Sequence, residues 1–271
     1  MNFATDSVNI RDDFVEKSVP PETCALEVAR YQAARKVSLD HGGFDVPEVL
    51  DWDERTGRIT LERFREIRAL RDWLKRGKND RTALYQAGRA LGCLHKHMRV
   101  PDTYATLDRV KANSPDEVYE PVVLHGDYSA MNVCWSVERN RIVVLDWGPV
   151  LSDGVKTLGP RYYDLGLFVA SLIRVWPWWV AVRRFACRTD LFIRGYTEVS
   201  EAVDWGLLRS YVLRFTGGYA RRRLQAAARQ PTPAAIRHAV LHGTSHAGAL
   251  VMTGSWKNRK TVARKQVETQ G

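Results

Sequence analysis

The stretch from Val122 to Gly148 constrains the fold of this chain more than any other part of its 271 residues. It reads VVLHGDYSAMNVCWSVERNRIVVLDWG, in which apolar runs alternate with polar loops. The pattern predicts three short strands, with a turn at residues 138–140 between the second and the third. Asp127, Asn132 and Asp146 lie at the ends of these strands. A carboxylate at the end of an apolar strand is costly to bury unless it is paired or bound to a metal, so the pattern indicates a polar site.

Two carboxylates and an amide at these positions suit phosphoryl transfer. In that reaction one carboxylate accepts the proton of the attacking hydroxyl, while an amide oxygen and a second carboxylate hold Mg²⁺ against the nucleotide phosphates. Kinases carry this set in the motif H-R-D-L-x-x-x-N, followed by D-F-G. Residues 125–132 read HGDYSAMN and residues 146–148 read DWG, so the spacing of the first motif is kept. The rival interpretation is a β-hairpin whose Asp and Asn side chains only stabilise turns.

With Gly126 in place of Arg, these motifs resemble the aminoglycoside phosphotransferase and choline kinase-like family more than the protein kinases. The resemblance implies an ATP-dependent phosphotransferase with an alcohol group as acceptor, using ATP and Mg²⁺ as cofactors. It implies Asp127 as the catalytic base, with Asn132 and Asp146 as metal ligands. It also implies that His125 organises the catalytic loop.

The resemblance further implies an α+β, protein-kinase-like fold of two lobes. A small, abbreviated nucleotide-binding lobe is expected at residues 1–64, and a mainly helical catalytic and acceptor-binding lobe at residues 65–271. Two strands are predicted around the turn at residues 55–57, and the segment after them would be the hinge that takes the adenine. Glu62 would offer its carbonyl there and Phe64 its N–H, although this segment could also be an ordinary edge strand.

The start of the chain contains a candidate for the lysine that kinases place near the nucleotide phosphates. The sequences SVNI and FVEKSV predict two short strands around a turn at residues 11–13, and Lys17 lies in the second. A helix is predicted over residues 21–37, because Pro residues mark its start and apolar residues recur along it. The resemblance implies that Lys17 pairs with Glu27 on this helix, with Glu22 as the alternative. Without the kinase fold, Lys17 would be an ordinary surface residue.

One feature departs from the kinase pattern, since the glycine-rich loop that covers the phosphates is missing. No Gly occurs before Gly42. Either the first hairpin is abbreviated, or the backbone of a turn near Asp6 and Ser7 holds the phosphates. The departure keeps open a second function, a nucleotide-binding pseudokinase that regulates a partner.

The net charge of +10 is unevenly placed along the chain. Residues 174–271 contain 17 Lys and Arg but only 5 Asp and Glu, and no acidic residue occurs over residues 205–267. Such asymmetry predicts an anionic partner or substrate. The expected acceptor is therefore an anionic small molecule or glycoconjugate, with a lipopolysaccharide inner-core sugar as one alternative. Peripheral contact with an anionic membrane surface is a further expectation, whereas no motif supports nucleic-acid binding.

The cysteines and the apolar runs point to a cytoplasmic protein. The four cysteines are scattered without a CxxC pair, which favours neither a disulfide framework nor a zinc site. Residues 1–7 are too polar for a signal peptide, and the apolar runs are too short to span a bilayer. The sequence WPWW at residues 176–179 could contact a membrane interface, but helix core is the favoured interpretation.

Helices are also predicted over residues 67–75, 82–98, 207–228 and 233–253, the second with Thr82 as its cap. Asp164 opens a further apolar helix, and we interpret it as a capping residue rather than a catalytic one. Three histidines follow one another at four-residue intervals in the last helix, but no further metal ligand is evident. They are His238, His242 and His246.

Overall fold

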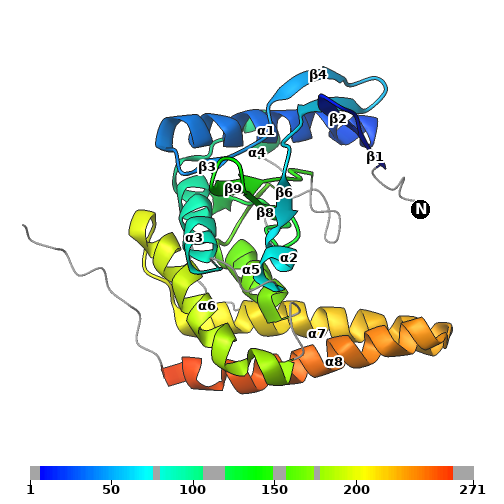
Figure 1. Ribbon diagram of the computed structural model, residues 1–271, viewed down its shortest axis with the longest axis vertical. Helices are drawn as coiled ribbons and strands as arrows, with labels where there is room; N and C mark the ends of the chain where they lie inside the picture. The colour runs from blue at the N-terminus through cyan, green and yellow to red at the C-terminus, as the bar shows by residue number, and fades with distance from the viewer. Residues whose placement is uncertain (1–6, 76–79, 106–119, 149–156, 174–177, 259–271) are drawn as a thin grey trace, which may run out of the picture.

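The computed structural model describes residues 7–75, 80–105, 120–148, 157–173 and 178–258. A small part built from a sheet and one long helix lies above a larger, mainly helical part (Figure 1). The predicted α+β class is therefore confirmed. The predicted WPWW patch lies outside the residues whose side chains the structure describes.

The small part contains a four-stranded antiparallel sheet in the order β1-β2-β5-β4. Its first two strands and their turn are those predicted. The helix α1 covers one face of the sheet and begins at a proline, whose missing N–H costs nothing there. It ends at Gly42, whose φ of 65° is accessible to glycine, and so runs four residues beyond the predicted end. The bounds are β1 (Ser7–Ile10), β2 (Phe14–Ser18), α1 (Pro21–His41), β4 (Val49–Asp53) and β5 (Arg58–Glu62).

A second four-stranded sheet lies in the order β3-β9-β8-β6. The hairpin of β8 and β9 confirms two of the strands predicted in the stretch with the two motifs, and Asn140 occupies its turn with a φ of 51°. The third, β7, pairs instead with β10. The short strand β3 pairs in parallel with β9. The bounds are β3 (Phe44–Asp45), β6 (Ile67–Ala69), β7 (Val122–Val123), β8 (Val133–Ser136), β9 (Arg141–Val144) and β10 (Leu158–Gly159).

Two predicted boundaries are wrong. Residues 67–69 do not start a helix, because they pair with β8 as strand β6, and the helix α2 (Leu70–Lys75) begins only after them. Thr82 does not cap the next helix, because α3 (Asp80–His97) begins two residues earlier. The division into lobes at residue 64 stays a prediction.

In the larger part, α3 packs against α6, while α5 and α6 connect to the pair of α7 and α8. Helices α3 and α6 pack closely because Gly88 and Gly92 on α3 face backbone atoms of α6, where a Cβ atom would overlap with Phe192 or Tyr196. Asp204 caps α7 through two backbone N–H groups. The helices are α4 (Asp102–Ala105), α5 (Tyr162–Ile173), α6 (Trp178–Val199), α7 (Trp205–Arg229) and α8 (Pro233–Met252), followed by the 3-10 helix η1 (Gly254–Asn258).

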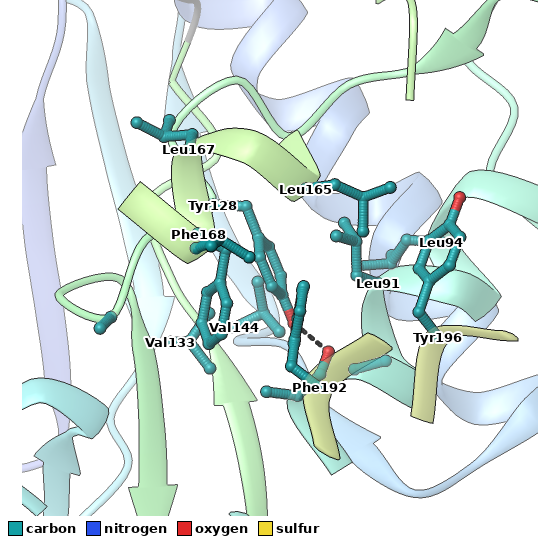
Figure 2. Close-up of a cluster of buried hydrophobic side chains, with 14 of the residues drawn as sticks. Leu91, Leu94, Tyr128, Val133, Val144, Leu165, Leu167, Phe168, Phe192 and Tyr196 are labelled. Atoms are coloured by element: carbon teal, nitrogen blue, oxygen red, sulfur yellow. Dashed lines mark hydrogen bonds between the residues drawn. The ribbon is translucent and has the colours of Figure 1, made fainter. Parts of the chain in front are cut away.

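An aromatic and aliphatic core fixes the loop between β7 and β8 to these helices (Figure 2). The ring of Phe168 on α5 stacks on that of Phe192 on α6, with centroids 4.1 Å apart. Tyr128 lies in the loop, packs against Phe168, and donates its hydroxyl to the carbonyl of Ala87 on α3 at 2.7 Å. The loop is thus anchored to α3 and α5 directly, and to α6 through Phe168.

Two further features concern the state of the cysteines and the length and polarity of the helices. Cys24, Cys93 and Cys134 are buried and Cys187 is exposed, and all four are free thiols. Within the part of the chain that the structure describes, each helix is either too short or too polar to cross a lipid bilayer.

The importance of this core can be tested on α3. Leu91→Ala should lower the free energy of unfolding by about 2–5 kcal/mol, because Leu91 is fully buried and its loss leaves a cavity. Urea denaturation would measure the change. The matched control is Leu39→Ala on α1, whose side chain is 72% exposed and should matter little. Equal effects of the two substitutions would contradict the assignment of the core.

Candidate active site

Lys17 lies at the centre of a buried network of charges. Strand β2 directs its side chain inward, where Nζ lies 2.6 Å from Glu27 Oε1 and 2.7 Å from Asp146 Oδ1. Burial would lower the pKa of Lys17, but the carboxylates of Glu27 and Asp146 outweigh burial and raise it, so the ammonium stays charged. The predicted pair of Lys17 and Glu27 is therefore present in the structure. The alternative partner Glu22 is exposed.

Asp146 connects this network to the open part of the site. Its backbone adopts a φ of 60°, which is uncommon outside glycine and occurs at functional sites. Burial would raise the pKa of Asp146, but the charge and hydrogen bond of Lys17 hold the pKa below its usual value. The side chain remains 46% exposed, so a ligand can reach it. A Cβ atom at Gly148 would lie 3.3 Å from Glu27 Oε2 and 3.4 Å from Lys17 Nζ, so a larger residue after Trp147 would crowd the network.

Asp127 and Asn132 face each other within the loop between β7 and β8. The amide nitrogen of Asn132 donates to the backbone carbonyl of Asp127 at 3.1 Å and to its Oδ2 at 2.9 Å. This orientation turns the amide oxygen of Asn132 away from Asp127. Asp127 is exposed although the residues around it in the loop are buried, so its carboxylate is accessible to a ligand.

His125 holds the start of this loop against the DWG segment. Its Nδ1 accepts from the backbone N–H of Asp127 at 3.2 Å, so Nε2 carries the proton that is donated to the carbonyl of Leu145 at 3.0 Å. The ring packs against Trp147, with centroids 4.5 Å apart. Burial lowers the pKa of His125 to about 4, so the ring is neutral near pH 7. These contacts are those of a residue that organises the loop.

Asp164 supports the same loop from α5 and is fully buried. Its carboxylate accepts from the backbone N–H groups of His125 at 2.7 Å and Gly126 at 2.8 Å, and Nε2 of His95 lies 3.1 Å away. Burial would raise the pKa of Asp164, but His95 and these donors lower it. Asp164 is thus structural. It was predicted to cap its own helix, but its carboxylate instead accepts from N–H groups of the loop between β7 and β8.

Arg30 is a functional candidate that sequence reasoning missed. It lies on α1 and is fully buried, with Nη1 donating to the carbonyl of Gly148 and Nη2 to those of Leu124 and His125, each at 2.7 Å. One guanidinium therefore joins α1 to both motifs. Helical periodicity gave a signal, because Arg30 lies three residues after Glu27 and so shares its inward face.

These groups border a cleft of about 1110 Å³ between the first sheet and the β8–β9 hairpin. Lys17, Asn132 and Asp146 line the cleft together with the predicted hinge residues Glu62 and Phe64. Most of the remaining lining is apolar and suits a planar base. It includes Val8, Ile10, Val15, Tyr31, Leu61, Ile67 and Leu145.

The side chains of the predicted hinge residues contact arginines. Glu62 accepts from Arg35 at 3.0 Å and from Arg139 at 3.3 Å. The guanidinium of Arg139 also lies 4.5 Å from the ring centre of Phe64. Contact of adenine with the backbone of these two residues stays a prediction.

The described residues contain an abbreviated first hairpin. The turn at residues 11–13 joins β1 directly to the strand of Lys17, and Arg63 donates to the carbonyls of Arg11 and Asp12. The turn is thus tied to the predicted hinge segment through Arg63. The alternative phosphate loop falls partly on Asp6, outside the described residues.

The donor groups of the site fit Mg²⁺. Asp146 and Asn132 can supply a carboxylate and an amide oxygen, which are ligands that this hard cation prefers. Among the described residues, no group of three or more His, Cys, Asp or Glu side chains is placed to hold a metal ion. Mg²⁺ at this site would therefore take further ligands from phosphates and water, as it does in kinases.

Comparisons with known proteins bear on these features. A family model described as "Phosphotransferase enzyme family" matches residues 99–211, which include both motifs. The predicted family resemblance is confirmed. The match and the motifs support an ATP-dependent phosphotransferase that acts on hydroxyl groups. Comparison with curated protein sequences finds no significant match.

Solved structures share the fold at low sequence identity. A choline/ethanolamine kinase family protein from Mesorhizobium loti has a TM-score of 0.60 at 16% identity, with 92% of this chain and 89% of that chain covered. An ethanolamine kinase from Plasmodium vivax has a TM-score of 0.53 at 10% identity, covering 93% and 83%. The choline kinase LicA from Streptococcus pneumoniae has a TM-score of 0.52 at 11% identity, covering 92% and 89%. The predicted protein-kinase-like fold is thereby confirmed.

The contribution of Arg30 can be measured by removing its donors. Arg30→Met should lower the free energy of unfolding by roughly 3 kcal/mol or more, because three buried carbonyls lose their donor. Arg30→Lys keeps a charge but lacks the planar fork, so an intermediate loss is expected. Urea denaturation would compare both with Lys36→Met, which changes an exposed cation on the same helix. A loss no larger than that of Lys36→Met would contradict the role of Arg30.

The neutral state of His125 predicts a pH dependence. The folded pKa is lowered from 6.5 to about 4, so the contribution of His125 to stability is complete above pH 6.5 and is lost as the pH falls towards 4. The full change amounts to about 3 kcal/mol. Urea denaturation at several pH values should give a shallower slope in this window for His125→Gln than for the wild type. The control is the exposed His238→Gln, and equal slopes for all three proteins would refute the buried neutral ring.

Proposed function

We propose that this protein is an ATP-dependent kinase that phosphorylates a hydroxyl group of an anionic small molecule or glycoconjugate. The observation that carries the proposal is a continuous set of groups at one end of the cleft. Lys17 contacts Asp146, both line the cleft with Asn132, and Asn132 contacts Asp127. This set has the composition that phosphoryl transfer requires.

Each residue of the set has a separate role in the proposal. The exposed carboxylate of Asp127 accepts the proton of the acceptor hydroxyl and orients it for attack. Asp146 and the amide oxygen of Asn132 hold Mg²⁺, which neutralises the charge of the phosphates when it is bound. Lys17, positioned by Glu27, contacts the nucleotide phosphates. At the other end of the cleft, the backbone of Glu62 and Phe64 binds adenine.

The charge of the helical part supports an anionic acceptor. Choline and ethanolamine, which the names of two similar structures mention, are cations. A kinase for a cation is expected to offer acidic groups, whereas this chain has no acidic residue over residues 205–267. A sugar acid, a phosphorylated metabolite or a lipopolysaccharide inner-core sugar fits this charge better. We also propose a cytoplasmic location, which the four free thiols support.

A nucleotide-binding pseudokinase that regulates a partner is the second candidate. The observation that favours it is the turn at residues 11–13, which Arg63 ties to the hinge segment. This turn also contains no glycine, unlike the loop that covers the phosphates in kinases. Such a module would bind nucleotide without turning it over.

Turnover measurements with substituted proteins would separate these candidates. ATP consumption with Mg²⁺ would be followed against aminoglycosides, choline, sugar acids and core oligosaccharide. Asp127→Asn should lower kcat by roughly 10²–10⁴-fold while the nucleotide still binds, because only the proton acceptor is lost. Asp146→Ala should abolish Mg²⁺-dependent turnover. The control is Asp51→Asn, an exposed carboxylate on β4.

The outcomes have distinct meanings. Turnover of an anionic acceptor that both substitutions remove would support the kinase and its substrate class. Equal turnover of cationic aminoglycosides would contradict the anionic acceptor. Nucleotide binding without turnover of any acceptor would favour the pseudokinase, and full activity of Asp127→Asn would refute the assigned base.

A further inference from the structure

The hairpin of α7 and α8 lies at the end of the molecule opposite the β1-β2-β5-β4 sheet and projects to one side (Figure 1). At its base it packs against α5, α6 and η1. In its far half the side chains are exposed along residues 221–230, apart from Ala227, and along residues 231–241, apart from the half-buried Ala235 and Ala239. These exposures leave the far half uncovered by the rest of the described chain.

The outward face of α8 carries a stripe of apolar and small residues, here called the outer stripe. Its members recur at intervals of four and three residues and therefore share one helical face. All of them are exposed, although an unpartnered helix normally presents polar groups to water. The residues of α8 that are buried against the body, Ser245, Gly248 and Ala249, fall between them. The outer stripe consists of Ile236, Val240, Gly243, Ala247 and Leu250.

The partner helix α7 also exposes an aliphatic side chain in the far half of the hairpin. Leu224 on α7 is 65% exposed and lies three residues before Ala227, the residue of this segment that is buried in the hairpin. Residues three apart on a helix lie on adjacent parts of its surface, so Leu224 borders the contact between the helices. Val240 on α8 is 60% exposed. Aliphatic groups of both helices are thus open to solvent near the tip.

The same half of the hairpin is strongly cationic. It carries five exposed arginines, and no acidic residue of α7 or α8 balances them. Arginine binds phosphate groups well because its planar donors match phosphate geometry. The five are Arg221, Arg222, Arg223, Arg229 and Arg237.

We propose that the α7–α8 hairpin docks onto an anionic lipid bilayer, with the outer stripe and Leu224 among the headgroups and the arginines on lipid phosphates. A helix surface that combines exposed aliphatic groups with Arg and lacks acidic residues fits such a surface. The inference goes beyond the proposed kinase activity and does not rest on it.

Two other occupants explain only part of the surface. A nucleic acid would explain the arginines but not the aliphatic stripe, since its backbone is bound through charge and hydrogen bonds. A second copy would explain the spacing of the stripe, which suits helix packing. It would also bring two arginine clusters into one assembly, without acidic residues on the hairpins to compensate. A bilayer of anionic lipid satisfies both features.

Vesicle flotation with the full chain tests the proposal. The protein should float with vesicles of phosphatidylcholine and phosphatidylglycerol but not with vesicles of phosphatidylcholine alone, and raised salt should weaken binding. The double substitution Arg221→Gln and Arg229→Gln should weaken the apparent affinity roughly 25-fold, because each cation near an anionic surface contributes about fivefold. Ile236→Ser with Val240→Ser should weaken it roughly tenfold or more.

Matched controls lie in the small part of the molecule. Leu39→Ser removes an exposed aliphatic group from α1, and Lys36→Gln with Arg55→Gln removes two exposed cations, so both should bind vesicles as the wild type does. Circular dichroism would verify that each protein is folded. Binding that the hairpin substitutions leave unchanged, or that the control substitutions weaken equally, would overturn the proposal. So would a dimer in sedimentation equilibrium that Ile236→Ser with Val240→Ser dissociates, or tighter binding to an RNA oligonucleotide than to anionic vesicles.

Discussion

A single guanidinium, that of Arg30, holds the carbonyl groups of Leu124, His125 and Gly148 in place. Because arginine keeps its charge in proteins and offers five donors, it can satisfy three buried carbonyls that no neutral side chain could reach together. The same helix carries Glu27, which positions Lys17. The orientation of α1 therefore fixes both the lysine and the two motif loops in one frame, and a rotation of this helix would disturb all of them.

Buried charges around the site are compensated by neighbouring groups of opposite charge and by hydrogen bonds. The ammonium of Lys17 lies between two carboxylates, and Asp164 lies beneath the loop where backbone N–H groups and His95 surround it. His125 remains neutral because burial lowers its pKa. Since an unpaired buried charge is far more costly than a paired one, this arrangement explains how a small loop can keep several ionisable groups out of water. It leaves Asp127 as the exposed carboxylate of the loop.

Local patterns in the sequence predicted the features that depend on local spacing. The hairpin of β8 and β9 follows from alternation, and the start of α1 follows from its prolines. The pair of Lys17 and Glu27 was expected from the resemblance to the kinase family. The features that were missed arise from contacts between distant segments. Residues 67–69 favour a helix by their neighbours, but pairing with β8 makes them a strand. Arg30 and Asp164 are intelligible only once α1 and α5 lie against the catalytic loop.

The short strand β3 has a consequence for how the chain folds. It follows α1 directly, yet it forms its parallel pairing with β9, a strand from the stretch that carries the two motifs. The sheet of β8 and β9 therefore includes two residues, Phe44 and Asp45, that lie about a hundred residues earlier in the chain than their partners in β9. Such non-local pairings form slowly. The Lys17 network can therefore form only when both segments are in place, because Asp146 lies two residues after β9.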